Sequence, residues 1–389
     1  MESLLLGLGL SVLSAKVLNA IIIGVIILLV FVTIGGILTW VERRVSGFIQ
    51  SRLGPNRVGP QGVLQWVADG VKLIFKEDLI PDGSDRILFR IAPYFCLIGV
   101  FCTLVVMPWG TGVIVADLNV GLFYFISITS LVVIGVLMAG WSSNNKWSLL
   151  GGMRAAAQIV SYEIPVGMGL LVPILIAGTL SMQGIVGAQG WLPWDWMLFK
   201  SPFTVISFII FFIGSLAEAN RIPFDLPEAE SELVSGYCTE YSGFRYAVFF
   251  LSEWANLFVM GGLTTVVYLG GGNLPGIVAD NAILSVVVFG IKTSVVVFVV
   301  MWIRWTLPRF RIDQLMKLSW KYLLPGAFLA FFGQAIYMLL TWEYQKVQYA
   351  VAVVVFVLFL GVLLKFIKRV AVNIKEQKLP VNSPNAPLA

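Results

Sequence analysis

The chain has 389 residues and a formal net charge of +5, and 58% of its residues are hydrophobic while only 12% are charged. Soluble domains carry about 25% charged residues, so an ordinary water-soluble fold is excluded. The sequence contains no histidine and only three cysteines, which excludes histidine-ligated haem, histidine–zinc sites, Ser-His triads and a four-thiolate iron–sulfur cluster within this chain. We therefore expect no metal site, and any electron carrier must be a ligand or belong to a partner.

Nine apolar runs reach or approach the roughly 20 residues that a helix needs to cross the hydrocarbon core. In chain order they cover residues 20–41, 91–109, 119–141, 155–179, 202–219, 246–269, 282–303, 322–342 and 347–366. The preceding segment has no basic start and no small-residue cleavage site, so we expect an interfacial lead-in rather than a signal peptide. The sequence predicts an all-α integral membrane protein, a polytopic bundle of about nine transmembrane helices over residues 1–366, with a disordered cytoplasmic tail over residues 367–389.

Lysine and arginine predict the orientation. The connections after runs one, three, five and seven, together with the tail, hold 22 of the 26 basic residues. The opposite side holds Lys16, Lys200 and Lys346, and Lys292 lies within a run. The positive-inside rule therefore predicts an N-terminus outside the cell and a cytoplasmic C-terminus.

The first cytoplasmic connection, residues 42–90, opens with charged residues and continues through a segment rich in glycine and proline, which forces turns. A helical pattern then follows from Gln61 to Lys76, in which one polar stripe comprises Gln65, Asp69, Lys72 and Lys76. The pattern predicts an amphipathic helix at the cytoplasmic side. It either lies in the interface plane or packs on the bundle. Both arrangements leave a crevice through which a lipid-soluble molecule could enter.

The connection after the fifth run is unusual because its acids outnumber its bases. It holds Glu218, Asp225, Glu228, Glu230, Glu232 and Glu240 against Arg221 and Arg245. Pro227 is typical of a helix start, and carboxylates in a first turn complement the helix dipole, which accounts for Glu228 and Glu230. The other acids favour a proton relay, because clustered carboxylates raise one another's pKa.

Three ionisable residues lie inside predicted spans. Glu163 and Glu253 fall roughly 10–12 Å below the cytoplasmic end at ~1.5 Å per residue, and Lys292 lies near mid-bilayer. Each costs about 2.5–3.5 kcal/mol on insertion scales, so these residues need partners or a water-filled path. One alternative is a structural ion pair between Lys292 and a glutamate. Pro165 also frees a backbone carbonyl that water could occupy.

Four segments, in order, resemble the H-subunit family of respiratory complex I, the proton-translocating NADH:quinone oxidoreductase. They are Glu42-Arg43-Arg44 through Gly54-Pro55-Asn56-Arg57-Val58-Gly59-Pro60 with Ala68-Asp69-Gly70-Val71-Lys72-Leu73; Ser161-Tyr162-Glu163-Ile164-Pro165; Glu218-Ala219-Asn220-Arg221-Ile222-Pro223-Phe224-Asp225-Leu226-Pro227-Glu228-Ala229-Glu230-Ser231-Glu232-Leu233 through Glu240-Tyr241; and Lys292-Thr293 with Trp302-Ile303-Arg304 and Leu307-Pro308-Arg309-Phe310-Arg311. The resemblance spans roughly residues 20–342, and the final run carries no motif that matches it.

The resemblance implies a subunit without redox centres in an enzyme that passes electrons from NADH through FMN and iron–sulfur clusters of partner subunits to a quinone. This subunit would build much of the quinone chamber, with the first span, the helix around Asp69 and the sixth span framing its entrance. Candidate chamber residues are Arg43, Arg44, Arg52, Asp69, Arg221, Arg304 and Arg309. The implied proton path comprises Glu163, Glu218, Asp225, Glu228, Glu230, Glu232, Glu240 and Glu253, and we add the intramembrane Lys292.

The resemblance also implies partners: soluble iron–sulfur and quinone-site subunits on the cytoplasmic side, and antiporter-like and small subunits within the cell inner membrane. Membrane lipid and quinone are the expected small molecules, and we expect no nucleic acid. Two alternatives stay open. One is the related membrane subunit of an energy-converting hydrogenase. The other is a stand-alone proton- or cation-coupled transporter, which would explain Glu163, Glu253 and Lys292 but not the long charged connections.

Overall fold

In the computed structural model, the residues described are 12–226, 230–276, 281–341 and 345–377, and within these ranges the chain is helical with no named strand. The all-α prediction is confirmed. Seven segments are long and apolar enough to cross a membrane: α2 (Val12–Ile49), α4 (Arg86–Val106), α5 (Gly121–Ser142), α6 (Lys146–Ala177), α10 (Gly243–Tyr268), α11 (Ala282–Thr306) and the stretch Ile312–Thr341. Two shorter apolar helices, α8 (Pro202–Glu218) and residues Lys346–Val362 of α14 (Gln345–Gln377), coincide with the two other predicted spans.

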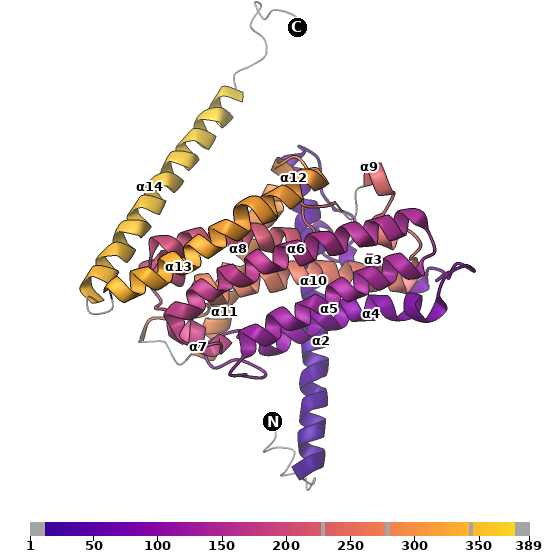
Figure 1. The fold of residues 1–389 in the computed structure, drawn as a ribbon. Coiled ribbons are helices and arrows are strands. Elements are labelled where there is room, and N and C mark those ends of the chain that lie inside the picture. The colour runs from indigo at the N-terminus through magenta and orange to yellow at the C-terminus, as the bar shows by residue number, and fades with distance from the viewer. Residues whose placement is uncertain (1–11, 227–229, 277–280, 342–344, 378–389) are drawn as a thin grey trace, which may run out of the picture.

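Short helices fill the connections. At the predicted cytoplasmic end lie η1 (Pro60–Gly62), α3 (Gln65–Phe75), α9 (Glu230–Leu233), η4 (Gly236–Cys238) and α12 (Ile312–Lys317). The predicted outer end holds α7 (Met182–Gly187), η2 (Pro193–Asp195) and η3 (Met197–Phe199). A π-helix, η6 (Leu318–Leu323), joins α12 to α13 (Leu324–Thr341). Figure 1 shows the central helices running side by side, while α2 and α14 extend beyond them.

The first helix is longer than predicted at both ends. With 38 residues it is about 57 Å long, and Glu42, Arg43 and Arg44 lie within it rather than in the following connection, which begins only after Ile49. The part of the expected interfacial lead-in from Val12 onward belongs to the same helix. Small residues on one face let this helix pack closely, since a Cβ on Gly36 would clash with the ring of Trp66.

The last helix also continues beyond its predicted end. α14 runs to Gln377, whereas the predicted span ends at residue 366. The final residues, 378–389, lie outside the described ranges. The predicted amphipathic helix is present as α3, which begins at Gln65 rather than at Gln61 because Gln61 has a positive φ of 53° within η1.

Three prolines inside long helices leave carbonyls without their helical partner, since proline has no N–H to donate to the residue four positions earlier. A hydroxyl from another segment donates to each carbonyl. Ser319 Oγ donates to Ser161 O (2.6 Å), across from Pro165. Ser207 Oγ donates to Gly169 O (2.7 Å), across from Pro173. We expected water at the Ser161 carbonyl, and the structure supplies a side chain there, which satisfies the backbone where water is scarce.

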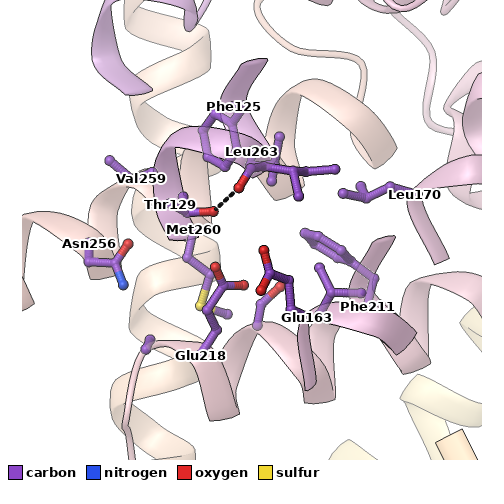
Figure 2. Close-up of a pocket in the computed structure, with 14 residues that line it drawn as sticks. Phe125, Thr129, Glu163, Leu170, Phe211, Glu218, Asn256, Val259, Met260 and Leu263 are labelled. Carbon is purple, nitrogen blue, oxygen red and sulfur yellow. Dashed lines mark hydrogen bonds between the residues drawn. The ribbon is translucent and has the colours of Figure 1, made fainter. Parts of the chain in front are cut away.

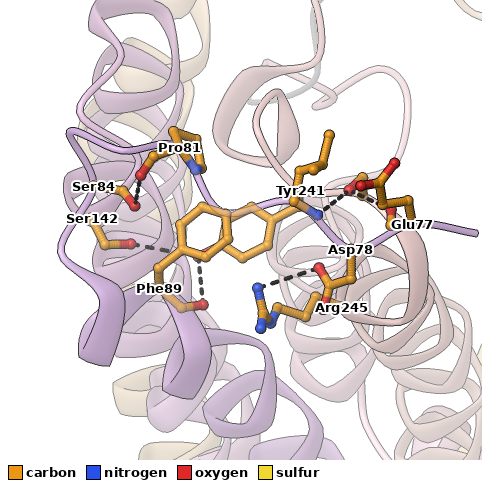
Figure 3. A network of polar contacts seen from close by, with 10 residues as sticks. Glu77, Asp78, Pro81, Ser84, Phe89, Ser142, Tyr241 and Arg245 are labelled. Atoms are coloured by element: carbon orange, nitrogen blue, oxygen red, sulfur yellow. Dashed lines mark hydrogen bonds and ion pairs between the residues drawn. The ribbon is translucent and has the colours of Figure 1, made fainter.

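The acidic connection after α8 is attached to the bundle at the third of these carbonyls. Tyr241 OH donates to Phe89 O (3.2 Å), the carbonyl opposite Pro93, and the Tyr241 ring stacks on Phe89 at 4.0 Å. Beside it, Arg245 pairs with Asp78 at 3.3 Å. Figure 3 shows this network joining the start of α4 to the start of α10. The connection that carries the acids is therefore held at a fixed position over the helices.

Candidate functional site

Six charged side chains meet at the predicted cytoplasmic end, where α2, α10 and α11 approach the segments that follow α8 and α11. They are Glu42, Arg221, Asp225, Glu253, Arg304 and Arg309, and we call them the ion cluster. Arg221 is 1% exposed and Glu42 is 5% exposed. Burial of full charges is costly unless they are paired, and here three guanidinium groups face three carboxylates, so the cluster has no formal net charge.

The ion cluster is held by short contacts. Arg304 Nη1 lies 2.5 Å from Glu42 Oε1, and Arg221 Nη1 lies 3.2 Å from Glu253 Oε1 and 3.9 Å from Glu42 Oε2. Arg221 also stacks over the ring of Trp254 at 4.3 Å, an arrangement that stabilises a cation. Arg221 thus joins two carboxylates from different helices, and its removal would leave both short of positive charge.

Asp225 connects the ion cluster to the segment before α12. Its carboxylate lies 3.5 Å from Arg309 Nη2. Burial raises the pKa of Asp225, the nearby Glu253 raises it further, and Arg309, Arg304 and Arg221 oppose the rise. If one of these arginines paired with another group instead, the pKa of Asp225 would rise further and its carboxyl would bind a proton more readily.

Two further carboxylates, Glu163 and Glu218, face a cavity within the bundle (Figure 2). The cavity has a volume of about 30 Å³, which is enough for a water molecule. Ser130 Oγ donates to Glu163 Oε1 at 2.5 Å. Apart from Thr129, Ser215 and Asn256, the lining is apolar: Phe125, Ile126, Val166, Leu170, Phe211, Ala219, Val259, Met260 and Leu263.

A second cavity of about 30 Å³ connects this region to the ion cluster. Glu218 and Asn256 line both cavities, and Glu253, a member of the ion cluster, lines the second. Glu253, Glu218 and Glu163 therefore lie in sequence along two neighbouring cavities, with Glu218 lining both of them.

The other predicted chamber residues lie on α2, on α3 and on the connection between them. Arg43 Nη1 lies 2.5 Å from Asp69 Oδ2, and Lys72 lies 3.7 Å from Asp69 Oδ1. Arg44 donates to Gln61 at 3.3 Å, and Arg52 donates to Gln50 at 2.5 Å. Arg43 and Asp69 thus bridge the two helices. Arg44 and Arg52 instead contact glutamines at the ends of the connection that joins the helices.

Other predicted proton-path residues lie apart from the two cavities. Glu232 pairs with Arg154 at 2.7 Å, and Glu240 accepts from Asn145 Nδ2 at 2.6 Å. Glu230 begins the one-turn helix α9, which lies close to the predicted helix start, while Glu228 lies outside the described residues. The structure therefore joins Glu163, Glu218, Asp225 and Glu253 to one site, and it places Glu232 and Glu240 elsewhere on the acidic connection.

Lys292 lies at the opposite end of the bundle. Its Nζ donates to Leu269 O at 2.7 Å and to Gly271 O at 3.0 Å, and it sits 4.6 Å from the Trp196 ring centroid. These carbonyls follow the C-terminal end of α10, where a cation complements the helix dipole. Among the described residues, Lys292 neither forms the alternative ion pair with a glutamate nor shares a cavity with Glu163.

Glu42 belongs to the ion cluster, but from the sequence it was only part of a motif and not a candidate chamber or proton-path residue. The buried face of α2 reads Gly35, Thr39, Glu42 and Ser46, with spacings of four, three and four, which is the period of one helix face. That pattern of small and polar residues could have indicated a packed face carrying a charge. Asn256 has a weaker signal, since it follows Glu253 by three positions on α10.

The sequence is similar to proteins of one known family. The sequence model of the NADH dehydrogenase family matches residues 21–335. A protein of Anaeromyxobacter dehalogenans, named as the H subunit of NADH-quinone oxidoreductase, is 53% identical over 325 residues, covering 79% of each chain. Proteins of the same name from Chlorobium luteolum and Bacillus cytotoxicus are each 50% identical, over 77% and 80% of this chain and 83% and 92% of their own.

Proposed function

We propose, starting from the fact that this chain belongs to the NADH dehydrogenase family as an H subunit of NADH-quinone oxidoreductase, that it forms much of the quinone chamber of that enzyme and carries a proton path away from it. The observation that supports this most is the buried ion cluster, which two small cavities connect to Glu218 and Glu163. Quinone is the substrate at this subunit. FMN and iron–sulfur clusters belong to partner subunits.

The ion cluster is the proposed inner wall of the chamber, and the junction of α2 and α3 at the Arg43–Asp69 pair is its proposed entrance. A quinone is lipid-soluble, and α3 exposes apolar side chains such as Ile74 and Phe75 beside the Arg43–Asp69 pair. Such a surface lies naturally at headgroup depth in a membrane. Arg309 is the member of the ion cluster with the most exposed side chain, at 32%, and is best placed to contact a headgroup.

The coupling follows from charge. Reduction of a quinone takes up two electrons and two protons, so charge at the headgroup changes during the reaction. A change beside the neutral ion cluster alters the interaction of Asp225 and Glu253 with their arginines, and hence their affinity for protons. Glu253 passes this change to Glu218 across the second cavity, and Glu218 passes it to Glu163 across the first.

The proposed setting is the cell inner membrane, with the N-terminus outside and the C-terminus in the cytoplasm, as the distribution of basic residues favours. The acidic connection and α12 then face the soluble partner subunits. The lateral faces of the bundle, where large apolar side chains such as Trp141 and Leu339 are exposed, contact lipid and the antiporter-like and small membrane subunits.

Purification in mild detergent tests the assembly. We expect the chain to co-purify with FMN- and iron–sulfur-containing subunits, detected by mass spectrometry and by the absorbance of their cofactors. Recovery with a nickel–iron subunit would instead favour the hydrogenase-type relative. Recovery of the chain alone, from a membrane that oxidises NADH with quinone, would contradict the proposal.

Arg309→Ala tests the chamber in the assembled enzyme. We expect the KM for quinone to rise about tenfold, the order that loss of one charged hydrogen bond produces, with a parallel loss of sensitivity to quinone-site inhibitors. Arg311→Ala is the matched control, because Arg311 is exposed on the same segment. Equal inhibitor sensitivity in the two variants would show that Arg309 does not contact the chamber.

A further inference from the structure

A third, larger cavity lies at the predicted outer end, away from the ion cluster. Its volume is about 570 Å³, within the range of ligand-binding pockets. It opens between the end of α6, the η2–η3 segment, the last turns of α13 and the first turns of α14. Its lining residues are Ile176, Trp194, Asp195, Lys200, Gln334, Tyr337, Met338, Gln348, Tyr349 and Ala352. α14 lies beyond residues 21–335, which the family shares.

The lining is unusually polar for a site at the edge of a membrane bundle. Among the described residues that line it, Lys200 is the cation and Asp195 the anion. Two buried donors on its wall, Trp194 Nε1 and Tyr337 OH, have no hydrogen-bond partner among the described residues. A buried donor that lacks a partner is costly, and such donors mark a place where a ligand with acceptor oxygens would be stabilised.

The charged pair indicates what kind of ligand fits. Lys200 Nζ donates to Ala188 O at 2.6 Å, and an ammonium has two further N–H groups to offer. Burial lowers the pKa of Lys200, and Asp195 opposes that shift. A phosphate beside Lys200 would favour its charged form, while the Asp195 carboxylate can accept hydrogen bonds from an ammonium.

The surroundings favour a lipid over a small soluble ion. Figure 1 shows α14 and α13 diverging from each other. On α14 Ala352 is buried and Phe356 packs on the core, whereas Val354, Val357 and Leu358, on the opposite face, are 57%, 60% and 65% exposed. Trp191, Trp194 and Trp196 lie in the neighbouring segment, and tryptophan gathers at the membrane–water interface. The cavity thus lies at headgroup depth, and apolar helix surface leads away from it into the bilayer.

We propose that this cavity binds a zwitterionic phospholipid with a primary ammonium, as in phosphatidylethanolamine. The phosphate receives hydrogen bonds from Lys200, Trp194 and Tyr337, and the ammonium donates to Asp195. The acyl chains lie along the apolar surfaces between α13 and α14. The lipid thereby fills the space between the η2–η3 segment and the first turns of α14.

The test uses the assembled enzyme in nanodiscs with equal amounts of phosphatidylethanolamine and phosphatidylglycerol, followed by detergent extraction and native mass spectrometry of the retained lipid. The wild type is expected to retain phosphatidylethanolamine. Asp195→Asn removes the charged acceptor for the lipid ammonium, which only phosphatidylethanolamine has, so the ratio of phosphatidylethanolamine to phosphatidylglycerol should fall by about tenfold, the effect of one charged hydrogen bond. Lys200→Met should reduce the retention of both lipids.

Two controls carry the same charge changes elsewhere. Asp117→Asn alters an acid of another outer connection, and Lys16→Met alters an exposed lysine on α2, so both should retain lipid as the wild type does. An unchanged lipid ratio in Asp195→Asn would overturn the proposal. A photo-crosslinking amino acid at position 349, which lines the cavity, provides a second measurement that does not depend on changing a charge. Crosslinking to a protein chain rather than to lipid would also overturn it.

Discussion

Glu218→Gln is expected to abolish most quinone-linked NADH oxidation and proton pumping together. Glu218 lines both small cavities and is the carboxylate between Glu253 and Glu163. Glutamine matches its size but cannot take up or release a proton, so the series would be interrupted at its centre. Since positioned acid–base groups contribute at least about 100-fold, we expect the coupled rate to fall by at least tenfold. The rate is measured as NADH oxidation with quinone, and pumping as the proton gradient in vesicles.

The controls separate coupling from assembly. Reduction of a water-soluble artificial acceptor by the partner subunits should be unchanged in Glu218→Gln, because the proposed function assigns the electron carriers to those subunits. Glu77→Gln alters an exposed carboxylate of the first connection and should retain the wild-type coupled rate. Glu163→Gln should resemble Glu218→Gln, and the double variant should be no worse than either, as expected for groups acting in series. Wild-type coupled rates in the double variant would refute the proton path.

Arg221→Met is expected to be the most destabilising single change in the site. It removes the guanidinium that lies within 3.2 Å of Glu253 and 3.9 Å of Glu42, and the buried carboxylates would be left undercompensated. Breaking a buried ion pair from one side costs about 3–5 kcal/mol. The measurement is the thermal unfolding of the assembled enzyme, together with the yield of this chain in it.

Arg154→Met is the matched control, because Arg154 pairs with Glu232, whose side chain is 57% exposed. An ion pair of that kind contributes about 0–1 kcal/mol. The double variant Arg221→Met with Glu253→Gln should recover part of the stability, since it removes the charge that was left unpaired. If Arg221→Met and Arg154→Met lowered stability equally, the ion cluster would not be a buried, charge-balanced unit.

The sequence predicted the helices and identified the charged residues within them, but it did not predict which groups those residues contact. Glu163, Glu253 and Lys292 were all identified as charges within apolar runs, because hydropathy and residue type are local properties. Their roles depend on neighbours distant in the sequence. Glu163 and Glu253 lie in or beside the series of cavities, whereas Lys292 binds the carbonyls of Leu269 and Gly271. Nothing in the runs themselves distinguishes these two outcomes.

Glu42 shows the same limit, because here the sequence predicted a helix end that contacts from distant segments remove. The end of the apolar run near residue 41 predicted the end of the first helix, since charged residues are costly in hydrocarbon. The helix instead continues to Ile49 because Arg304 and Arg221, from segments more than 170 positions away, compensate Glu42 inside the protein. Likewise, the carbonyl opposite Pro165 was expected to meet water, and Ser319 occupies it from a π-helix that no local pattern predicted.

By itself the sequence determined the fold class, the approximate spans and the family. The fold class and the spans follow from the solvent, because a lipid core tolerates only long apolar helices with satisfied backbones. The family follows from four motifs that occur in the expected order. The tertiary structure alone decided which charges meet in the ion cluster, and it formed the two cavities beside Glu218 and the larger cavity beside α14. Electrostatic energy falls with distance between atoms rather than with separation along the chain, so only the packed helices could bring these groups together.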